Sequence, residues 1–218
     1  MLKTRAIVLG QKDLRNHDAL VSFYSLDFGK ITLIARGLRK SSSKLAGQLD
    51  AFNLVDLMVI KGRERDYVGS AISENSFLEI KENYEKIILA GRGFRFLNDL
   101  TFERQADYNI FLLLRNFLHF LNKVELEKFS SSPNIVLSFF KLKLLEFLGY
   151  DFSSLKGDEN EPGLLSSFNK INPEVLSLKD KILSLDIEKP DSWGELKISP
   201  LEIKKINDFI ETIKGIIY

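Results

Sequence analysis

Basic side chains are concentrated in two short stretches of the first 80 residues, residues 36–44 and residues 61–65. Residues 30–65 contain eight Lys and Arg against three Asp and Glu, although the whole chain carries 31 basic and 30 acidic residues. Cations at this density neutralise successive phosphates of a nucleic-acid backbone, and such contacts do not depend on base sequence. A solvated surface is the competing interpretation for a block of like charge. The candidate phosphate-binding residues are Arg36, Arg39, Lys40, Lys44, Lys30, Lys61, Arg63 and Arg65.

A protein that binds a single strand also needs aromatic rings on which bases stack. Phe23 and Tyr24 are neighbours in an alternating segment, so they point to opposite faces and one of them can be exposed. Phe28 lies in a predicted turn and is the better candidate for a stacking platform. Packing in the core is the competing interpretation for every ring. The rings considered are Phe23, Tyr24, Phe28, Phe52, Tyr67 and Phe77.

Residue patterns typical of catalysis are weak or missing. The chain has no cysteine, which excludes disulfides, thiolate zinc sites and a cysteine nucleophile. The pair His17-Asp18 resembles part of a metal-dependent phosphohydrolase site, but His119 is the one other histidine, so further ligands are lacking. Gly91-Arg92-Gly93 lacks the third glycine of a dinucleotide-binding turn, and no Walker-type or Gly-x-Ser-x-Gly motif occurs. We therefore expect a protein that is not an enzyme and uses no metal or cofactor.

Five short apolar segments with strand-like alternation must position the basic residues. Turn residues separate them, among them Gly29 in a predicted hairpin and Gly62 in another. Residues 36–44 form a flexible basic loop in this interpretation, too polar and serine-rich to enter the core. Five strands with such turns suit a small barrel of the oligonucleotide-binding (OB) type, and an SH3-like barrel fits nearly as well. The predicted strands are residues 6–9, 20–24, 31–35, 52–60 and 67–72.

The apolar period changes to a helical one from about Tyr84. Residues 134–148 are apolar on nearly every side, which predicts the central helix of a bundle. Ser199-Pro200-Leu201-Glu202 is a capping box that begins the last helix, and residues 151–172 are expected to form an acidic loop. The fold class is therefore α+β, with an OB-type domain at residues 1–80 and an all-α domain at residues 81–218.

Charge divides between these two predicted domains. Residues 1–80 carry 12 basic and 9 acidic side chains, whereas residues 81–218 carry 19 and 21, so the near-neutral total conceals a basic barrel. The N-terminal apolar run is too short for a signal peptide, and no stretch approaches the ~18 apolar residues of a membrane span. We expect a cytoplasmic protein with no membrane partner.

Several of these segments, taken together, resemble one family. Ala35-Arg36-Gly37-Leu38-Arg39-Lys40, followed by Leu and then Phe52, is the most specific of them, and the helix that ends in Leu148-Gly149-Tyr150 is similar as well. These segments look like the bacterial DNA repair protein RecO family. The segments that carry the resemblance are residues 4–9, 17–21, 24–31, 35–52 and 140–150.

The resemblance implies a mediator of DNA repair and homologous recombination. Such a protein binds single- and double-stranded DNA, anneals complementary strands and assists RecA loading on single strands coated with single-strand-binding protein. The implied partners are RecR, the C-terminal tail of single-strand-binding protein and, indirectly, RecA, in the cytoplasm at the nucleoid. By position, the family's DNA-binding loop corresponds to Arg36, Arg39, Lys40 and Lys44, whereas Lys30, Lys61, Arg63 and Arg65 come from the charge pattern alone.

The chain departs from the family pattern after residue 150. Many members carry a four-cysteine zinc module there, but residues 151–175 contain no cysteine, so no structural zinc is expected. A pocket for the acidic tail needs apolar surface beside cations, for which Lys141, Lys143 and Phe139 are the candidates. Two alternatives stay open: a protein-interaction adaptor that binds an acidic segment and no DNA, and an RNA-binding protein.

Overall fold

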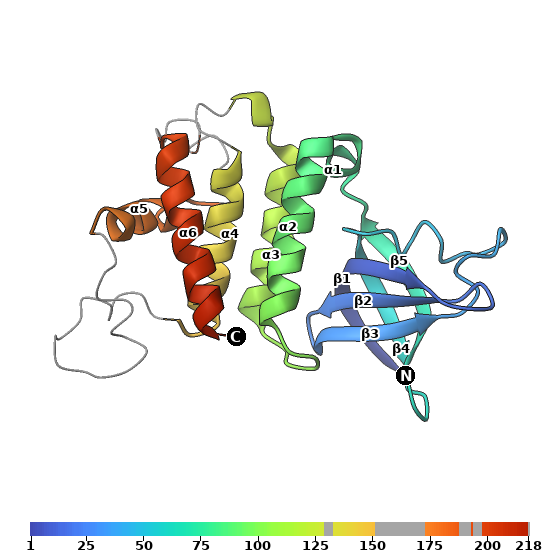
Figure 1. The fold of residues 1–218 in the computed structure, drawn as a ribbon. Coiled ribbons are helices and arrows are strands. Elements are labelled where there is room, and N and C mark those ends of the chain that lie inside the picture. Colours follow the sequence, from blue (N-terminus) through green and yellow to red (C-terminus); the bar gives the residue numbers. More distant parts are fainter. Residues whose placement is uncertain (129–132, 151–172, 188–192, 194–197, 218) are drawn as a thin grey trace. The chain divides into compact units, whose positions relative to one another are not determined.

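The computed structural model describes residues 1–128, 133–150, 173–187, 193 and 198–217. Two compact units divide the chain, residues 1–123 and residues 124–218 (Figure 1). The predicted acidic loop at 151–172 lies outside the described residues. The elements of the first unit are β1 (Leu2–Asp13), β2 (Ala19–Ser25), β3 (Gly29–Ala35), β4 (Leu54–Ile60), β5 (Tyr67–Asn75), α1 (Leu78–Glu82), α2 (Tyr84–Leu100) and α3 (Tyr108–Lys123). The second contains η1 (Leu126–Lys128), α4 (Asn134–Phe147), α5 (Pro173–Leu183) and α6 (Pro200–Ile217).

The five strands close into a barrel with the order β1-β2-β3-β5-β4. Neighbouring strands are antiparallel except β3 and β5, which run parallel and pair through Ile34 and Tyr67. β1 closes the sheet because its first half pairs with β4 and its second half pairs with β2. The register of β1 against β2 shifts between Val8 and Gly10. This Greek-key order confirms the OB-type barrel and removes the SH3-like alternative.

Alternating apolar side chains fill the barrel, as the period of two in the strands predicts. Phe23 from β2, Leu33 from β3 and Leu57 from β4 are almost completely buried in one cluster. Leu38 and Leu49, from the connection between β3 and β4, belong to the same cluster. The expectation that residues 36–44 stay out of the core was therefore wrong at Leu38, which anchors this connection to the barrel.

Three helices pack with the barrel in the first unit. The rings of Phe52 and Phe94 meet edge to face with centroids 5.2 Å apart, and Phe77 meets His119 in the same way at 5.0 Å. Burial, with Arg115 and Lys123 nearby, lowers the pKa of His119 below its usual value. The change from strands to helices falls where the sequence predicts it, but α1–α3 belong to the same compact unit as the barrel. A division into domains 1–80 and 81–218 thus stays a prediction about which parts fold independently.

The second unit is built around α4, as its apolar sequence predicts. α4 packs with α5 and α6, Phe139 meets Trp193 edge to face at 5.1 Å, and Lys141 Nζ lies 2.9 Å from Glu211 Oε1 of α6. The predicted capping box is present at α6, where the Ser199 amide donates to Glu202 Oε2 at 2.7 Å. These hydrogen bonds from Ser199 lower the pKa of Glu202. Within the described residues no helix combines the length and apolar character needed to cross a membrane.

We predict that Gly29→Ala destabilises the protein strongly. Gly29 begins β3 with φ at +62°, and a Cβ there would overlap the backbone carbonyl of Gln105 in the α2–α3 connection. The left-handed backbone and the steric overlap together should cost at least about 2 kcal/mol of the free energy of unfolding.

Urea unfolding measures this loss, and Gly91→Ala is the matched control. Gly91 is exposed on α2 with open space around it, so alanine there should raise stability by about 0.5–1 kcal/mol. Equal stability of Gly29→Ala and the unaltered protein would contradict the close packing of β3 on residue 105.

Candidate nucleic-acid interface

Three connections meet at one end of the barrel. The Ile34 amide at the end of β3 donates to the Asp66 carbonyl before β5 at 3.0 Å, and the Arg39 amide donates to the His17 carbonyl in the β1–β2 turn at 2.9 Å. These two hydrogen bonds hold the β1–β2 turn, the β3–β4 connection and the β4–β5 hairpin together. Exposed cations from all three form a surface that we call the cationic rim: Lys12, Arg15, Arg36, Arg39, Lys40, Lys44, Lys61, Arg63 and Arg65.

Specific contacts orient the first cations of the β3–β4 connection. The Arg36 guanidinium lies 4.3 Å from the centroid of the Tyr67 ring, a cation–π contact that links the start of the β3–β4 connection to β5. Arg39 Nε lies 2.7 Å from Asp13 Oδ1, with both side chains largely exposed. The Gly37 amide donates to Asp18 Oδ1 at 2.7 Å. Asp18 therefore shapes this connection, which accounts for the His17-Asp18 pair without a metal.

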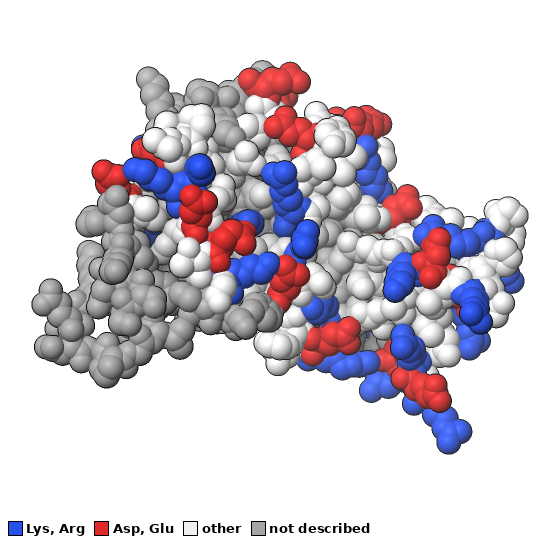
Figure 2. Space-filling view, in the orientation of Figure 1, with Lys and Arg blue, Asp and Glu red and all other residues white. Residues whose placement is uncertain are grey.

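A hydrogen-bonded aspartate organises the β4–β5 hairpin. Asp66 Oδ1 accepts from the Gly62 amide at 3.2 Å, and Asp66 Oδ2 lies 2.7 Å from Arg104 Nη2. The Arg104 hydrogen bond is the main cause that lowers the pKa of Asp66. Arg104 and Lys61 both act on Asp66, and Lys61, Arg63 and Arg65 are exposed around it. Figure 2 shows blue Lys and Arg side chains over this end of the barrel, with red acidic side chains among them.

A row of side chains crosses the outer barrel surface from the exposed rim residue Lys12, and its other members, Leu20, Ile34 and Tyr67, are half-buried. Lys12 pairs with Leu20, Leu20 with Ile34, and Ile34 with Tyr67, so these four side chains share one face of the sheet. The strands β2 and β3 and the turns that flank them form the oligonucleotide-binding surface of OB folds in general. A backbone bound to the rim would therefore pass beside this row.

The opposite half of the β2–β3 face is covered by the α2–α3 connection, residues 101–107. Lys30 Nζ donates to the Asn98 carbonyl at 2.8 Å, and Thr32 Oγ1 donates to Glu103 Oε1 at 2.9 Å. Burial lowers the pKa of Lys30, although Glu103 and Asp99 act in the opposite direction. The structure therefore places Lys30 at the junction with the helices and not with the other predicted cations, which the rim brings together.

The six aromatic rings considered in the barrel are buried or half-buried, as the packing interpretation expects. Phe23 points into the barrel, and Tyr24, on the outer face, is 1% exposed. Burial and the nearby Asp107 carboxylate raise the pKa of Tyr24. Phe28 packs against the barrel core from its turn. Alternation predicts which face a ring occupies, but it carries no information on a distant segment that covers that face.

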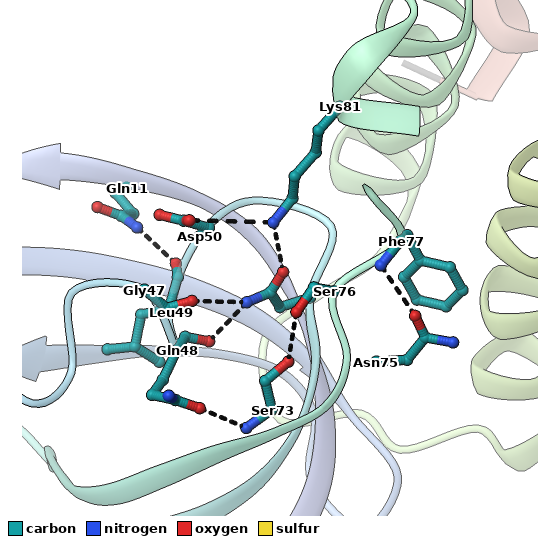
Figure 3. Close-up of polar contacts among 11 residues, drawn as sticks. Gln11, Gly47, Gln48, Leu49, Asp50, Ser73, Asn75, Ser76, Phe77 and Lys81 are labelled. Carbon is teal, nitrogen blue, oxygen red and sulfur yellow. Dashed lines mark hydrogen bonds and ion pairs between the residues drawn. The ribbon is translucent and has the colours of Figure 1, made fainter. Parts of the chain in front are cut away.

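A buried asparagine fixes the far arm of the β3–β4 connection. Residues 47–50 of this arm and Lys81 of α1 are labelled in Figure 3. Asn53 Nδ2 donates to the carbonyls of Gly47 and Gln48, each at 3.0 Å, and Asn53 Oδ1 accepts from Lys81 Nζ of α1 at 2.6 Å. Gln11 of β1 donates to the Leu49 carbonyl, and Gln48 accepts from the Ser73 amide of β5 at 2.7 Å. Burial is the main cause that lowers the pKa of Lys81, against the pull of Asp50. Both arms of the connection are thus attached to the barrel.

The candidate tail-binding residues lie in the second unit, and their side chains already have partners. Lys141 pairs with Glu211, and Lys143 Nζ lies 2.9 Å from Glu146 Oε2. Phe139 is 3% exposed beside Trp193, so it offers no apolar surface in this arrangement. Metal chemistry gains no support from the described part of the chain, where no three His, Cys, Asp or Glu residues gather.

Comparison with known proteins places these features in a family. The family model "Recombination protein O N terminal" matches residues 1–77, which cover the whole barrel and the three connections that carry the cationic rim. A DNA repair protein RecO of Alkaliphilus metalliredigens is 25% identical over 232 aligned positions, which span 97% of this chain and 91% of that protein. The chain belongs to the RecO family.

Two further RecO proteins match over shorter stretches. The protein of Desulforamulus reducens is 30% identical over 67% of this chain, a stretch that spans 55% of that relative's length. The protein of Cutibacterium acnes is 46% identical over 66 residues, which are 30% of this chain and 27% of that protein.

Of the cationic rim, sequence reasoning missed Lys12 and Arg15. The available signal was their position on either side of the end of β1, since two-strand turns in OB folds flank the binding surface.

We predict that Asn53→Ala loosens the β3–β4 connection. The substitution leaves the Gly47 and Gln48 carbonyls and the Lys81 ammonium without their shared partner, which should cost about 2–3 kcal/mol of the free energy of unfolding. Urea unfolding measures that loss, and limited trypsin digestion should cleave faster after Lys44. Asn109→Ala, at an exposed position on α3, is the control and should change neither quantity. Unchanged cleavage in Asn53→Ala would show that Asn53 does not hold the connection.

Proposed function

We propose that this protein serves DNA repair and recombination by binding DNA through the cationic rim. The observation that carries the proposal is the convergence of exposed Lys and Arg from three separate connections at one end of an OB-type barrel. Membership of the RecO family, whose relatives bear the name DNA repair protein, supports the same conclusion. Phosphate is the group that these cations recognise, so single and double strands both bind and base sequence matters little.

The mechanism that follows is strand annealing without a catalytic group. Two complementary strands repel each other because both are polyanions, and a cationic surface lowers that repulsion while it raises their local concentration. The first unit, which carries the rim, has 19 basic and 14 acidic residues, against 12 and 16 in residues 124–218. Binding is therefore local to one end of one unit and sensitive to salt.

Family membership also supports a role beside other recombination proteins. In this proposal the protein acts in the cytoplasm at the nucleoid, with RecR and with the acidic C-terminal tail of single-strand-binding protein. It thereby assists RecA loading on coated single strands. Lys141, Lys143 and Phe139 remain the proposed tail contacts, and engagement of Phe139 requires that its packing with Trp193 open.

The test is the salt dependence of binding to a labelled single-stranded DNA. We expect a slope of roughly −3 for log affinity against log salt, since each neutralised phosphate of a single strand contributes about −0.7 and four or five cations engage. The triple variant Arg36→Ala, Arg39→Ala, Lys40→Ala should reduce the slope to about −1 and slow annealing. Fluorescence anisotropy at several salt concentrations measures the slope.

The matched control removes three cations elsewhere. Arg92→Ala, Arg95→Ala, Lys204→Ala changes the net charge equally at exposed positions on α2 and α6, and should leave the slope near −3. An unchanged slope in the rim variant would exclude the rim from binding. Failure of the unaltered protein to bind any oligonucleotide at low salt would favour the adaptor hypothesis, and preference for ribose strands would favour RNA.

A further inference from the structure

Two exposed aromatic rings flank the segment that covers half of the β2–β3 face. Phe102, at the start of the α2–α3 connection, is 65% exposed, and Tyr108, at the first position of α3, is 60% exposed. The barrel's own rings are buried or half-buried, as described above. These two rings therefore have the property that stacking on a base requires and that the barrel rings lack: a free face.

The connection that carries them is firmly held. The Arg104 amide donates to the Lys30 carbonyl at 2.8 Å, and the Glu103 and Arg104 side chains bind Thr32 and Asp66. Arg104 itself has φ at +61°, a left-handed backbone that a non-glycine residue adopts at a cost and that its surroundings must enforce. None of these contacts uses the rings of Phe102 or Tyr108, so their exposure is not a consequence of a loose loop. A ring held on a fixed backbone loses little conformational entropy when a base stacks on it.

Chain geometry keeps both rings near the cationic rim. Arg104 reaches Asp66 at the base of the β4–β5 hairpin. Phe102 is two residues from Arg104 and Tyr108 is four residues away, so their Cα atoms lie within about 7 and 14 Å of it. A strand bound along the β4–β5 hairpin, which carries Lys61, Arg63 and Arg65 of the rim, thus passes close to the connection that holds both rings.

Charge decides which side of a strand faces the connection. Glu103 and Asp107 border the two rings, and Arg104 is already paired with Asp66. Carboxylates repel phosphates, whereas the rim attracts them. The arrangement therefore favours a strand with its phosphates on the rim and its bases toward residues 102–108.

We propose that Phe102 and Tyr108 are stacking platforms for unpaired bases of a single strand bound to the cationic rim. This inference rests on the proposed function and adds to it a means of telling single strands from duplex. Bases in a duplex are stacked on each other and offer no free face, so the rings contribute only to single-strand binding.

The test compares binding of three DNA ligands to the variant Phe102→Ala, Tyr108→Ala. We expect affinity for a thymine oligonucleotide to fall ~10-fold or more, because stacking on one ring contributes ~1–3 kcal/mol per base. Affinity for duplex should change less than twofold. An abasic strand of equal length should bind the variant and the unaltered protein equally. The slope against salt should stay near its original value, because no phosphate contact is removed.

Two controls separate stacking from structural effects. Phe102→Tyr, Tyr108→Phe keeps both rings and should retain single-strand affinity, while Tyr84→Ala removes an 80% exposed ring at the other end of α2 and should have no effect. Photo-crosslinking of an iodouracil-substituted oligonucleotide should label Phe102 or Tyr108. Unchanged single-strand affinity in the double alanine variant, or an equal loss for duplex, would overturn the inference. If the unaltered protein binds with a rim-dependent slope, that result leaves the proposed function standing.

Discussion

Closure of the barrel between β3 and β5 is the constraint on which the rest of the first unit depends. The four other strand contacts are antiparallel ladders of several residues, whereas β3 and β5 pair through Ile34 and Tyr67. The Ile34–Asp66 hydrogen bond and the Arg36–Tyr67 contact reinforce this junction. The same contacts bring the β3–β4 connection to the β4–β5 hairpin. The closure of the barrel and the assembly of the cationic rim therefore depend on the same contacts.

The cationic rim exists because charge is placed on connections while apolar residues are placed on strands. Leu38 and Leu49 enter the core from the β3–β4 connection, and Asn53 ties its far arm to α1. Cations between such anchors have a defined position without being buried. A polyanion that binds them does not have to order the connection first, so less of the interaction free energy is lost to conformational entropy.

Local patterns in the sequence predicted much of this arrangement. Alternation located the five strands, Gly29 marked a hairpin, and Ser199 and Glu202 marked a helix start. The charge pattern named all the rim cations except Lys12 and Arg15. The errors share a physical cause, which is contact between segments far apart in the chain. Alternation places Tyr24 on the outer face of the barrel, where it could be exposed, but the folded protein buries it. Lys30 donates to the Asn98 carbonyl and does not join the rim. Spacing within a strand holds no information on such contacts. The choice between two barrel types also needed a long-range fact, the pairing of β3 with β5.

The residues that finish the barrel are not part of its strands. β3 pairs with β5 only near its end, at Ile34. Nearer its start, Lys30 forms a parallel bridge with Glu103, and the Arg104 amide donates to the Lys30 carbonyl. A strand edge left open invites pairing with other chains. During synthesis β5 ends at Asn75, and residue 104 follows after roughly 1.5–6 s at ordinary elongation rates. For that interval the newly made barrel has an uncovered edge, and the α2–α3 connection then protects it. Residue 77 thus marks the end of the match to the family model, while the structure that covers the barrel edge extends into the helices.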